Sequence, residues 1–436
     1  MSFQSRFKDV DFKIKELSKK DKPENIGIKN NILSWAVFIP TIIMILLSIT
    51  SVIFPALLTR SASPFQGVVA TPEFVNPLQT GILAIPLVVI NLILLGIGIA
   101  YYKKKECKYR PIISKISNFE PTKKQATIVV IILLAIFVGL TAGTLAKEET
   151  WADYQGVKDR VNSWSVSDFA KSFEPHVKFL LLSISLKVFG NIRVVPFIAS
   201  ITLLLLTYFF TKKITNNRLA GLVSMTILLQ SQIFTSYSTA ASYDNTWILL
   251  YLFSLYLIEK FWSPSPVSYF VSIFSKALTV AFLPMSFYFI ARSSLSKKPK
   301  IYSLASYGVI VVLIAIAATV LGTNLVGTAI SFDSLLFWQG FTSMASQMRF
   351  DYVTLVFLLP VTVMLFFASR RKVLHADSIM IFVFSILFIS PLLSGFTDQT
   401  NQPYRFVSLV VFFAIGVGVL LSKRTRKQDE LLSSTQ

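Results

Sequence analysis

The sequence predicts an all-α, polytopic integral membrane protein. Hydrophobic residues make up 53% of its 436 residues, whereas charged residues make up only 15%. Apolar runs near the length that crosses the hydrocarbon core recur along the chain, so we expect about 10–12 transmembrane helices. Helices are expected at this depth because lipid offers no hydrogen-bond partners to an open backbone.

The clearest predicted spans share an apolar composition and few charged residues. They are Leu33–Ala56, Gly81–Tyr102, Thr127–Ala146, Arg193–Phe210, Leu219–Phe234, Asn245–Phe261, Ile301–Val326, Tyr352–Phe367, Ile379–Leu393 and Phe406–Leu421.

The stretch Pro266–Ala291 needs a different explanation, because basic residues such as Lys260 and Arg292 flank it on both sides. We expect either two short half-spans hinged near Ser275 and Lys276 or a segment that lies on the membrane surface. Non-helical backbone at membrane depth is tolerated only where protein or a wet cavity surrounds it. The ammonium group of Lys276 should therefore point into a cavity.

The formal net charge of +20 is a topology signal. If the N-terminus is cytoplasmic, the connections on the cytoplasmic side carry most of the 42 Lys and Arg residues, as the positive-inside rule requires. Both termini then lie in the cytoplasm. We expect a prokaryotic plasma membrane, and an endoplasmic reticulum membrane would give the same charge pattern. The excess of basic residues favours contact with anionic membrane lipid and not with nucleic acid. Residues 1–31 lack the apolar core of a signal peptide, and the single cysteine, Cys107, excludes disulfides.

Four segments are predicted along the chain. Residues 1–126 form a basic cytoplasmic segment with two extra transmembrane helices, and residues 127–292 form a catalytic core with an acidic outer loop at 147–192. Residues 293–422 contribute C-terminal transmembrane helices, and 423–436 form a cytoplasmic tail. Within the third segment, the outer loop Gly327–Asp351 is expected to line a substrate groove. No internal repeat favours a transporter built from two matching halves.

Acidic residues cluster at the predicted outer face. Glu148, Glu149 and Asp153 follow one span directly, and Asp244 lies between two later spans. Carboxylates here can act as a general base or bind a divalent cation, and we expect Asp153 to contact the substrate. If a metal binds, Glu148 and Asp244 are its expected ligands; each acid alone is equally typical of a solvated helix end.

Cationic and polar side chains are predicted on the same face, where they can meet a phosphate group. They are His176, Lys178, Arg193, Lys276, Tyr404 and Arg405. The forked donors of an arginine suit a phosphate, although snorkelling to the interface explains Arg405 equally well. A lysine inside an apolar stretch needs a partner or a function. Acids and cations on one face favour a reaction on a phosphate-bearing lipid.

The order of these motifs resembles the GT-C glycosyltransferases of the protein O-mannosyltransferase and aminoarabinose transferase superfamily. The resemblance covers residues 127–292, and beyond them only the span pattern and Tyr404-Arg405 support it. The motifs that carry it are Glu148-Glu149-Thr150, Glu174-Pro175-His176, Val188-Phe189-Gly190, Arg193 with Pro196, Tyr243-Asp244 and Ser275-Lys276-Ala277-Leu278.

This resemblance implies transfer of a sugar from a polyprenyl-phosphate-linked donor, with inversion, to a glycan, lipid or protein acceptor at the extracytoplasmic face. Glu148 would be the catalytic base with Glu149 beside it, Asp244 the second acid and Lys276 a phosphate contact. The chain departs from the family pattern at Glu148, where Asp is common, and at Glu174, where the family carries His or Lys.

Two other functions are compatible with the sequence. A carrier or flippase for lipid-linked solutes would need polar residues in the cytoplasmic halves of the spans, but these halves are rich in Leu, Ile, Val and Phe. A catalytically inactive GT-C-like membrane scaffold is favoured by the acidic residue at Glu174, which replaces a cation expected to meet phosphate.

Overall fold

The computed structural model describes residues 23–54, 78–102, 119–151, 153–163, 176–320, 331–396 and 405–422. Over these ranges the chain forms helices and turns without strands, which confirms the all-α prediction. Six of the described helices are long and apolar enough to cross a membrane, and four shorter apolar helices accompany them. The fold is that of an all-helical membrane protein.

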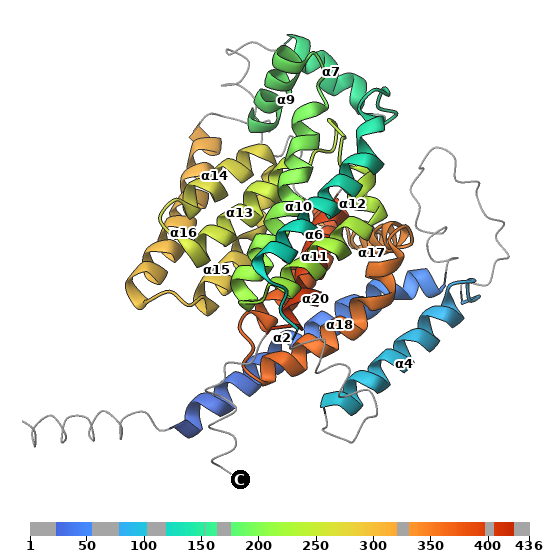
Figure 1. Ribbon diagram of the computed structural model, residues 1–436, viewed down its shortest axis with the longest axis vertical. Helices are drawn as coiled ribbons and strands as arrows, with labels where there is room; N and C mark the ends of the chain where they lie inside the picture. The colour runs from blue at the N-terminus through green and yellow to red at the C-terminus, as the bar shows by residue number, and fades with distance from the viewer. Residues whose placement is uncertain are drawn as a thin grey trace, which may run out of the picture.

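The described helices follow one another in the order shown in Figure 1. They are α2 (Pro23–Ile53), α4 (Ala84–Tyr102), α6 (Lys123–Thr141), α7 (Tyr154–Ser163), α9 (His176–Phe189), α10 (Val194–Thr215), α11 (Arg218–Gln230), α12 (Gln232–Ser236), α13 (Thr246–Lys260), α14 (Ser265–Ser275), α15 (Leu283–Arg292), α16 (Lys297–Val320), α17 (Ser334–Met348), α18 (Tyr352–Arg370), α19 (Ala376–Phe396) and α20 (Phe406–Val419).

Helix α20 forms the centre of the packed helices. It is apolar on all sides, and nearly every residue from Phe406 to Val419 is buried. Such a helix belongs in the interior, since it has no polar face to offer to solvent. Its Phe412 ring stacks on Phe382 of α19 at a centroid distance of 4.0 Å, and α10, α11, α18 and α19 pack around it.

The N-terminal helix α2 packs against α17, α18 and α19, which come from the far end of the chain. Figure 1 shows α2 running alongside α18. The Phe38 ring of α2 stacks on Phe366 of α18 at 4.2 Å. Helix α4 packs on α18, where Gly98 leaves room for the Met364 side chain. Small residues allow such close helix contacts in membrane proteins.

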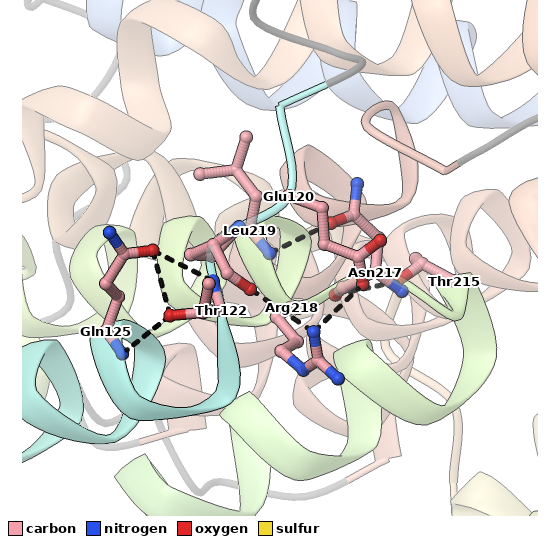
Figure 2. A network of polar contacts seen from close by, with 8 residues as sticks. Glu120, Thr122, Gln125, Thr215, Asn217, Arg218 and Leu219 are labelled. Carbon is pink, nitrogen blue, oxygen red and sulfur yellow. Dashed lines mark hydrogen bonds and ion pairs between the residues drawn. The ribbon is translucent and has the colours of Figure 1, made fainter.

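Polar contacts tie three helices together at the turn between α10 and α11 (Figure 2). Asn217 caps α11 by accepting a hydrogen bond from the Leu219 N–H, and its side-chain amide donates to the Leu421 carbonyl beyond α20, both at 2.9 Å. The neighbouring Arg218 donates to the Pro121 carbonyl at 3.2 Å, just before α6. We call this end of the molecule the Asn217 end.

A second polar cluster lies where α13, α15 and the start of α19 meet. Arg292 contacts the buried Asp377 carboxylate at 2.7 Å, and the Tyr288 hydroxyl donates to the same carboxylate at 2.9 Å. Nearby, Nε2 of His375 lies 3.1 Å from Glu259. Charged groups are rarely buried unless they are paired in this way.

At the opposite end of α10, which we call the α9 end, lie α7, α9 and the turn 237–245. Helix α9 ends at Gly190, whose φ of 67° is the left-handed conformation that glycine adopts without strain. The Val188-Phe189-Gly190 motif lies at the C-terminal end of this helix. The sequence predicted the hinge near Lys276, which is confirmed: α14 ends at Ser275, and Lys276 is extended, with φ −158° and ψ 118°.

The predicted helix Asn245–Phe261 matches α13, which has Asn245 and Phe261 as its caps. Two other predictions about elements were wrong. The predicted span Leu219–Phe234 is interrupted, because Ser231 ends α11 and caps the short helix α12. The predicted loop Gly327–Asp351 contains α17 (Ser334–Met348), which packs on α19.

Candidate functional site

The hinge after α14 places Lys276 beside charged residues from three other elements. Its ammonium nitrogen lies 5.2 Å from the centroid of the Trp247 ring in α13, a cation–π geometry. It interacts electrostatically with Arg405, Lys178 and Asp244. Residues from distant parts of the sequence therefore meet at this point.

Asp244 is the buried carboxylate of this group. It lies two residues before the start of α13, and its Oδ1 accepts a hydrogen bond from the Thr246 N–H at 2.9 Å. The positive end of the helix dipole stabilises a carboxylate at this position. Its Oδ2 lies 3.8 Å from Nζ of Lys178.

Lys178 reaches this site from the first turn of α9. Its ammonium group also donates a hydrogen bond to the carbonyl of Ser242. Burial lowers the pKa of Lys178, because the charged form loses water, and the nearby Asp244 carboxylate partly opposes this effect. Lys178 therefore contacts both the backbone and the acid of the turn 237–245.

Glu149 holds the same turn from the other side. Its carboxylate is buried and accepts the backbone N–H of Ala241 at 2.8 Å and that of Ser242 at 3.1 Å. Hydrogen bonds to an ionised acceptor are stronger than those between neutral groups. Glu149 thus fixes the backbone that leads into Asp244.

The adjacent acid, Glu148, points to the opposite side. Its side chain is 72% exposed, and Oε1 lies 3.2 Å from Nζ of Lys158 in α7. This hydrogen bond raises the pKa of Lys158. The two acids differ because they sit in extended chain after η1 (Ala142–Thr144), where neighbouring side chains point in opposite directions.

Arg193 is buried, and its guanidinium group donates hydrogen bonds to other groups of the same chain. Its Nε donates to the Thr239 carbonyl at 2.9 Å, and one terminal nitrogen donates to the Thr239 hydroxyl at 2.7 Å. The other terminal nitrogen donates to the carbonyls of Thr144 and Lys147. Four of the five guanidinium donors are therefore used to join the end of α6 to the turn 237–245. This geometry favours a structural role over the phosphate contact that the sequence suggested.

Asp153 belongs to an aromatic cluster at the α9 end. Its Oδ2 accepts a hydrogen bond from the Tyr243 hydroxyl at 2.7 Å. The Trp151 ring stacks on Tyr237 at a centroid distance of 5.0 Å and meets Tyr243 edge-on at 5.8 Å. The sequence suggested Asp153 as a substrate contact but did not suggest these rings.

Two serine hydroxyls near the charged group were missed by sequence reasoning. Ser242 and Ser275 are buried, and their Oγ atoms make no hydrogen bond with the part of the chain that is described. Buried polar atoms usually have a partner. The sequence signal for a ligand at these hydroxyls is their position: Ser242 lies two residues before Asp244, and Ser275 directly precedes Lys276.

The remaining predicted residues lie at the edge of this group or beyond the described residues. His176 begins α9 and its ring stacks on Phe274 at 6.2 Å. Arg405 is half-buried at the N-cap of α20. Tyr404 and Glu174 lie outside the described residues.

Within the described ranges, no group of three or more His, Cys, Asp or Glu side chains is arranged to hold a metal ion. The two ligands that the sequence suggested each face a lysine instead: Glu148 faces Lys158, and Asp244 faces Lys178.

Comparisons with protein-family models, curated proteins and solved structures find no match to this chain.

Proposed function

We propose that the chain is a membrane glycosyltransferase of the GT-C type. It would transfer a sugar from a polyprenyl-phosphate-linked donor to a hydroxyl of an acceptor. The observation that carries this proposal is the contact of Lys178 with the buried carboxylate of Asp244, together with the electrostatic interaction of Lys276 with Lys178, Arg405 and Asp244. Cations that are fixed in place stabilise the charge of a departing phosphate, and a carboxylate can accept the proton of the attacking hydroxyl.

The geometry favours Asp244 as the base, in place of Glu148. Glu148 is solvated and paired with Lys158, whereas both oxygens of Glu149 are occupied by backbone N–H groups. The acceptor oxygen would attack the anomeric carbon while its proton passes to Asp244. The bond from that carbon to the phosphate oxygen breaks, and its electron pair leaves with the phosphate. Attack opposite the leaving group inverts the anomeric centre.

The buried serine hydroxyls support a ligand at the same place. Ser242 and Ser275 flank the charged group in sequence and lie close to Asp244 and Lys276 along the chain. Hydroxyl groups donate hydrogen bonds to phosphate oxygens. A bound phosphate would satisfy groups that otherwise carry a cost of burial.

The charge pattern of the sequence supports a site that faces the extracytoplasmic side of the membrane. With both termini in the cytoplasm of a prokaryotic cell, the α9 end faces the extracytoplasmic side of the plasma membrane. Donor and acceptor would then meet at that face, and the acceptor is a glycan, a lipid or a protein.

The test is turnover of purified protein with polyprenyl-phosphate sugars. Asp244→Asn should abolish transfer, and Glu148→Gln should keep most of it. Asp159→Asn is a matched control, because Asp159 is another carboxylate of the α9 end and contacts Gln155 instead of the charged group. Full activity of Asp244→Asn would refute the assignment of the base. Absence of donor binding in the folded native protein would favour the inactive scaffold.

A further inference from the structure

The aromatic cluster of Trp151, Tyr237 and Tyr243 presents one large ring to solvent. Tyr237 and Tyr243 are buried, whereas Trp151 is 37% exposed. One face of the Trp151 ring is covered by Tyr237, with the planes only 23° apart. Its exposed area therefore belongs mainly to the opposite face and the edge.

This ring is fixed in position by its neighbours. Tyr243 meets Trp151 edge-on and also packs against Tyr237 at 5.9 Å. The Tyr243 hydroxyl is held by Asp153. A ring supported in this way loses little conformational freedom when a ligand stacks on it.

The cluster lies next to the proposed catalytic acid in the chain. Tyr243 directly precedes Asp244, and Trp151 follows Glu149 by two residues. Two chemically different groups of side chains therefore occur at this end of the molecule. Lys178, Lys276 and Arg405 suit an anion, whereas the rings and carboxylates around Trp151 suit a neutral ligand.

We propose that the exposed face of Trp151 binds a pyranose ring of the acceptor, which makes the acceptor a neutral glycan. The C–H groups on one face of a sugar ring carry partial positive charge, and an aromatic face carries negative charge. The carboxylates of Asp153 and Glu148 would accept hydrogen bonds from the sugar hydroxyls. This inference rests on the proposed function and identifies the acceptor class.

An interfacial tryptophan anchored in lipid headgroups is the competing explanation. The acids around Trp151 disfavour it, because Glu148 and Asp153 are costly to place against lipid. The exposed ion pair of Glu148 with Lys158 adds two charged groups that favour water over lipid at this surface.

Saturation-transfer NMR on the purified full-length protein tests the inference without any donor. The probes are methyl α-mannopyranoside, methyl β-glucopyranoside and methyl α-arabinopyranoside. We expect at least one of them to receive saturation, with at least a fivefold loss in Trp151→Ala and partial retention in Trp151→Phe. The matched control is Trp338→Ala, because Trp338 in α17 is also exposed and packs on other aromatic rings.

The outcomes separate this inference from the proposed function. Glycoside binding that survives in Asp244→Asn and disappears in Trp151→Ala supports the aromatic site whether or not transfer occurs. Absence of binding in the native protein, or equal binding in Trp151→Ala, overturns the inference. Quenching of Trp151 fluorescence by brominated lipid in vesicles, absent in Trp151→Phe, would also overturn it and would assign the ring to the membrane interface.

Discussion

Nζ of Lys178 lies 3.8 Å from Oδ2 of Asp244, in a pair whose side chains are only 14% and 5% exposed. The same ammonium group donates to the carbonyl of Ser242, in the turn that leads to Asp244. Lys178 therefore helps to fix the position of the acid and of the turn that carries it.

The pH dependence of the rate of transfer should reflect the protonation of Lys178. Burial lowers the pKa of Lys178, although Asp244, Glu149 and Asp153 raise it and Arg160 lowers it further. We expect the rate of transfer to fall as pH rises through this lowered pKa, below the ordinary value of 10.5. Lys178→Arg should move this fall to higher pH, because arginine stays protonated. An unchanged pH profile in that variant would exclude the lysine as the titrating group.

The contribution of Lys178 to the free energy of unfolding should rise with pH over the range in which the rate of transfer falls. Between the lowered pKa of folded Lys178 and 10.5, the unfolded chain binds more protons than the folded chain. The contribution of Lys178 to the free energy of unfolding therefore rises with pH in this range. Unfolding in detergent, followed by intrinsic fluorescence, should show this rise in the native protein relative to Lys178→Met. Loss of activity without loss of stability would separate titration from denaturation.

Replacing Glu149 by glutamine should weaken the turn 237–245. The Gln amide can accept one of the two hydrogen bonds, but its NH₂ group would face the other backbone N–H. An unsatisfied buried donor costs about 1–3 kcal/mol. We expect a lower unfolding temperature for Glu149→Gln and almost no change for Glu148→Gln, whose side chain is exposed. Equal stability of the two variants would contradict the assigned orientations.

Arg193→Lys should destabilise the protein without a specific loss of donor binding. Lysine cannot reach Thr144, Lys147 and Thr239 together, and each hydrogen bond to a charged group contributes about 1.5–3 kcal/mol. The control is Arg218→Lys, because Arg218 is more exposed and makes longer contacts. A large loss of affinity for polyprenyl phosphate, with an unchanged unfolding temperature, would instead restore the phosphate contact suggested by the sequence.

Asp377→Asn should be strongly destabilising. It leaves Arg292 without the carboxylate that it contacts at 2.7 Å, and removal of one partner from a buried pair costs about 3–5 kcal/mol. Because Arg292 is partly exposed, we expect the lower end of this range. The double variant with Arg292→Met should recover part of the loss, which a double-mutant cycle measures. Additive effects would show that the pair is not coupled.

The sequence predicted the fold class and the hinge because these follow from composition and from local signals. Basic flanks on both sides of Pro266–Ala291 required a turn. The break after Gln230 could not be predicted in the same way, because Ser231 looks like any serine in an apolar run. Its hydroxyl bonds to Asp351, far away in sequence.

The candidate site was predicted in its residue types but not in their roles. Lys178, Asp244 and Lys276 do lie together, as a common face of the membrane implied. The sequence could not tell Glu148 from Glu149, because the direction of a side chain in an irregular segment depends on tertiary contacts. The sequence also could not show that the Arg193 guanidinium donates to backbone carbonyls. Those carbonyls lie in irregular segments, and their positions depend on the tertiary structure.

The polar contacts around Asn217 also determine where the helices can move. They fasten the start of α6, the start of α11 and the end of α20 at one point. Helix α10, with 22 residues, extends about 33 Å from that point, so a tilt of about 5° displaces its far end by about 3 Å. If these helices tilt about the Asn217 end, the resulting displacement is largest at the α9 end, where Lys178, Asp244 and Lys276 lie.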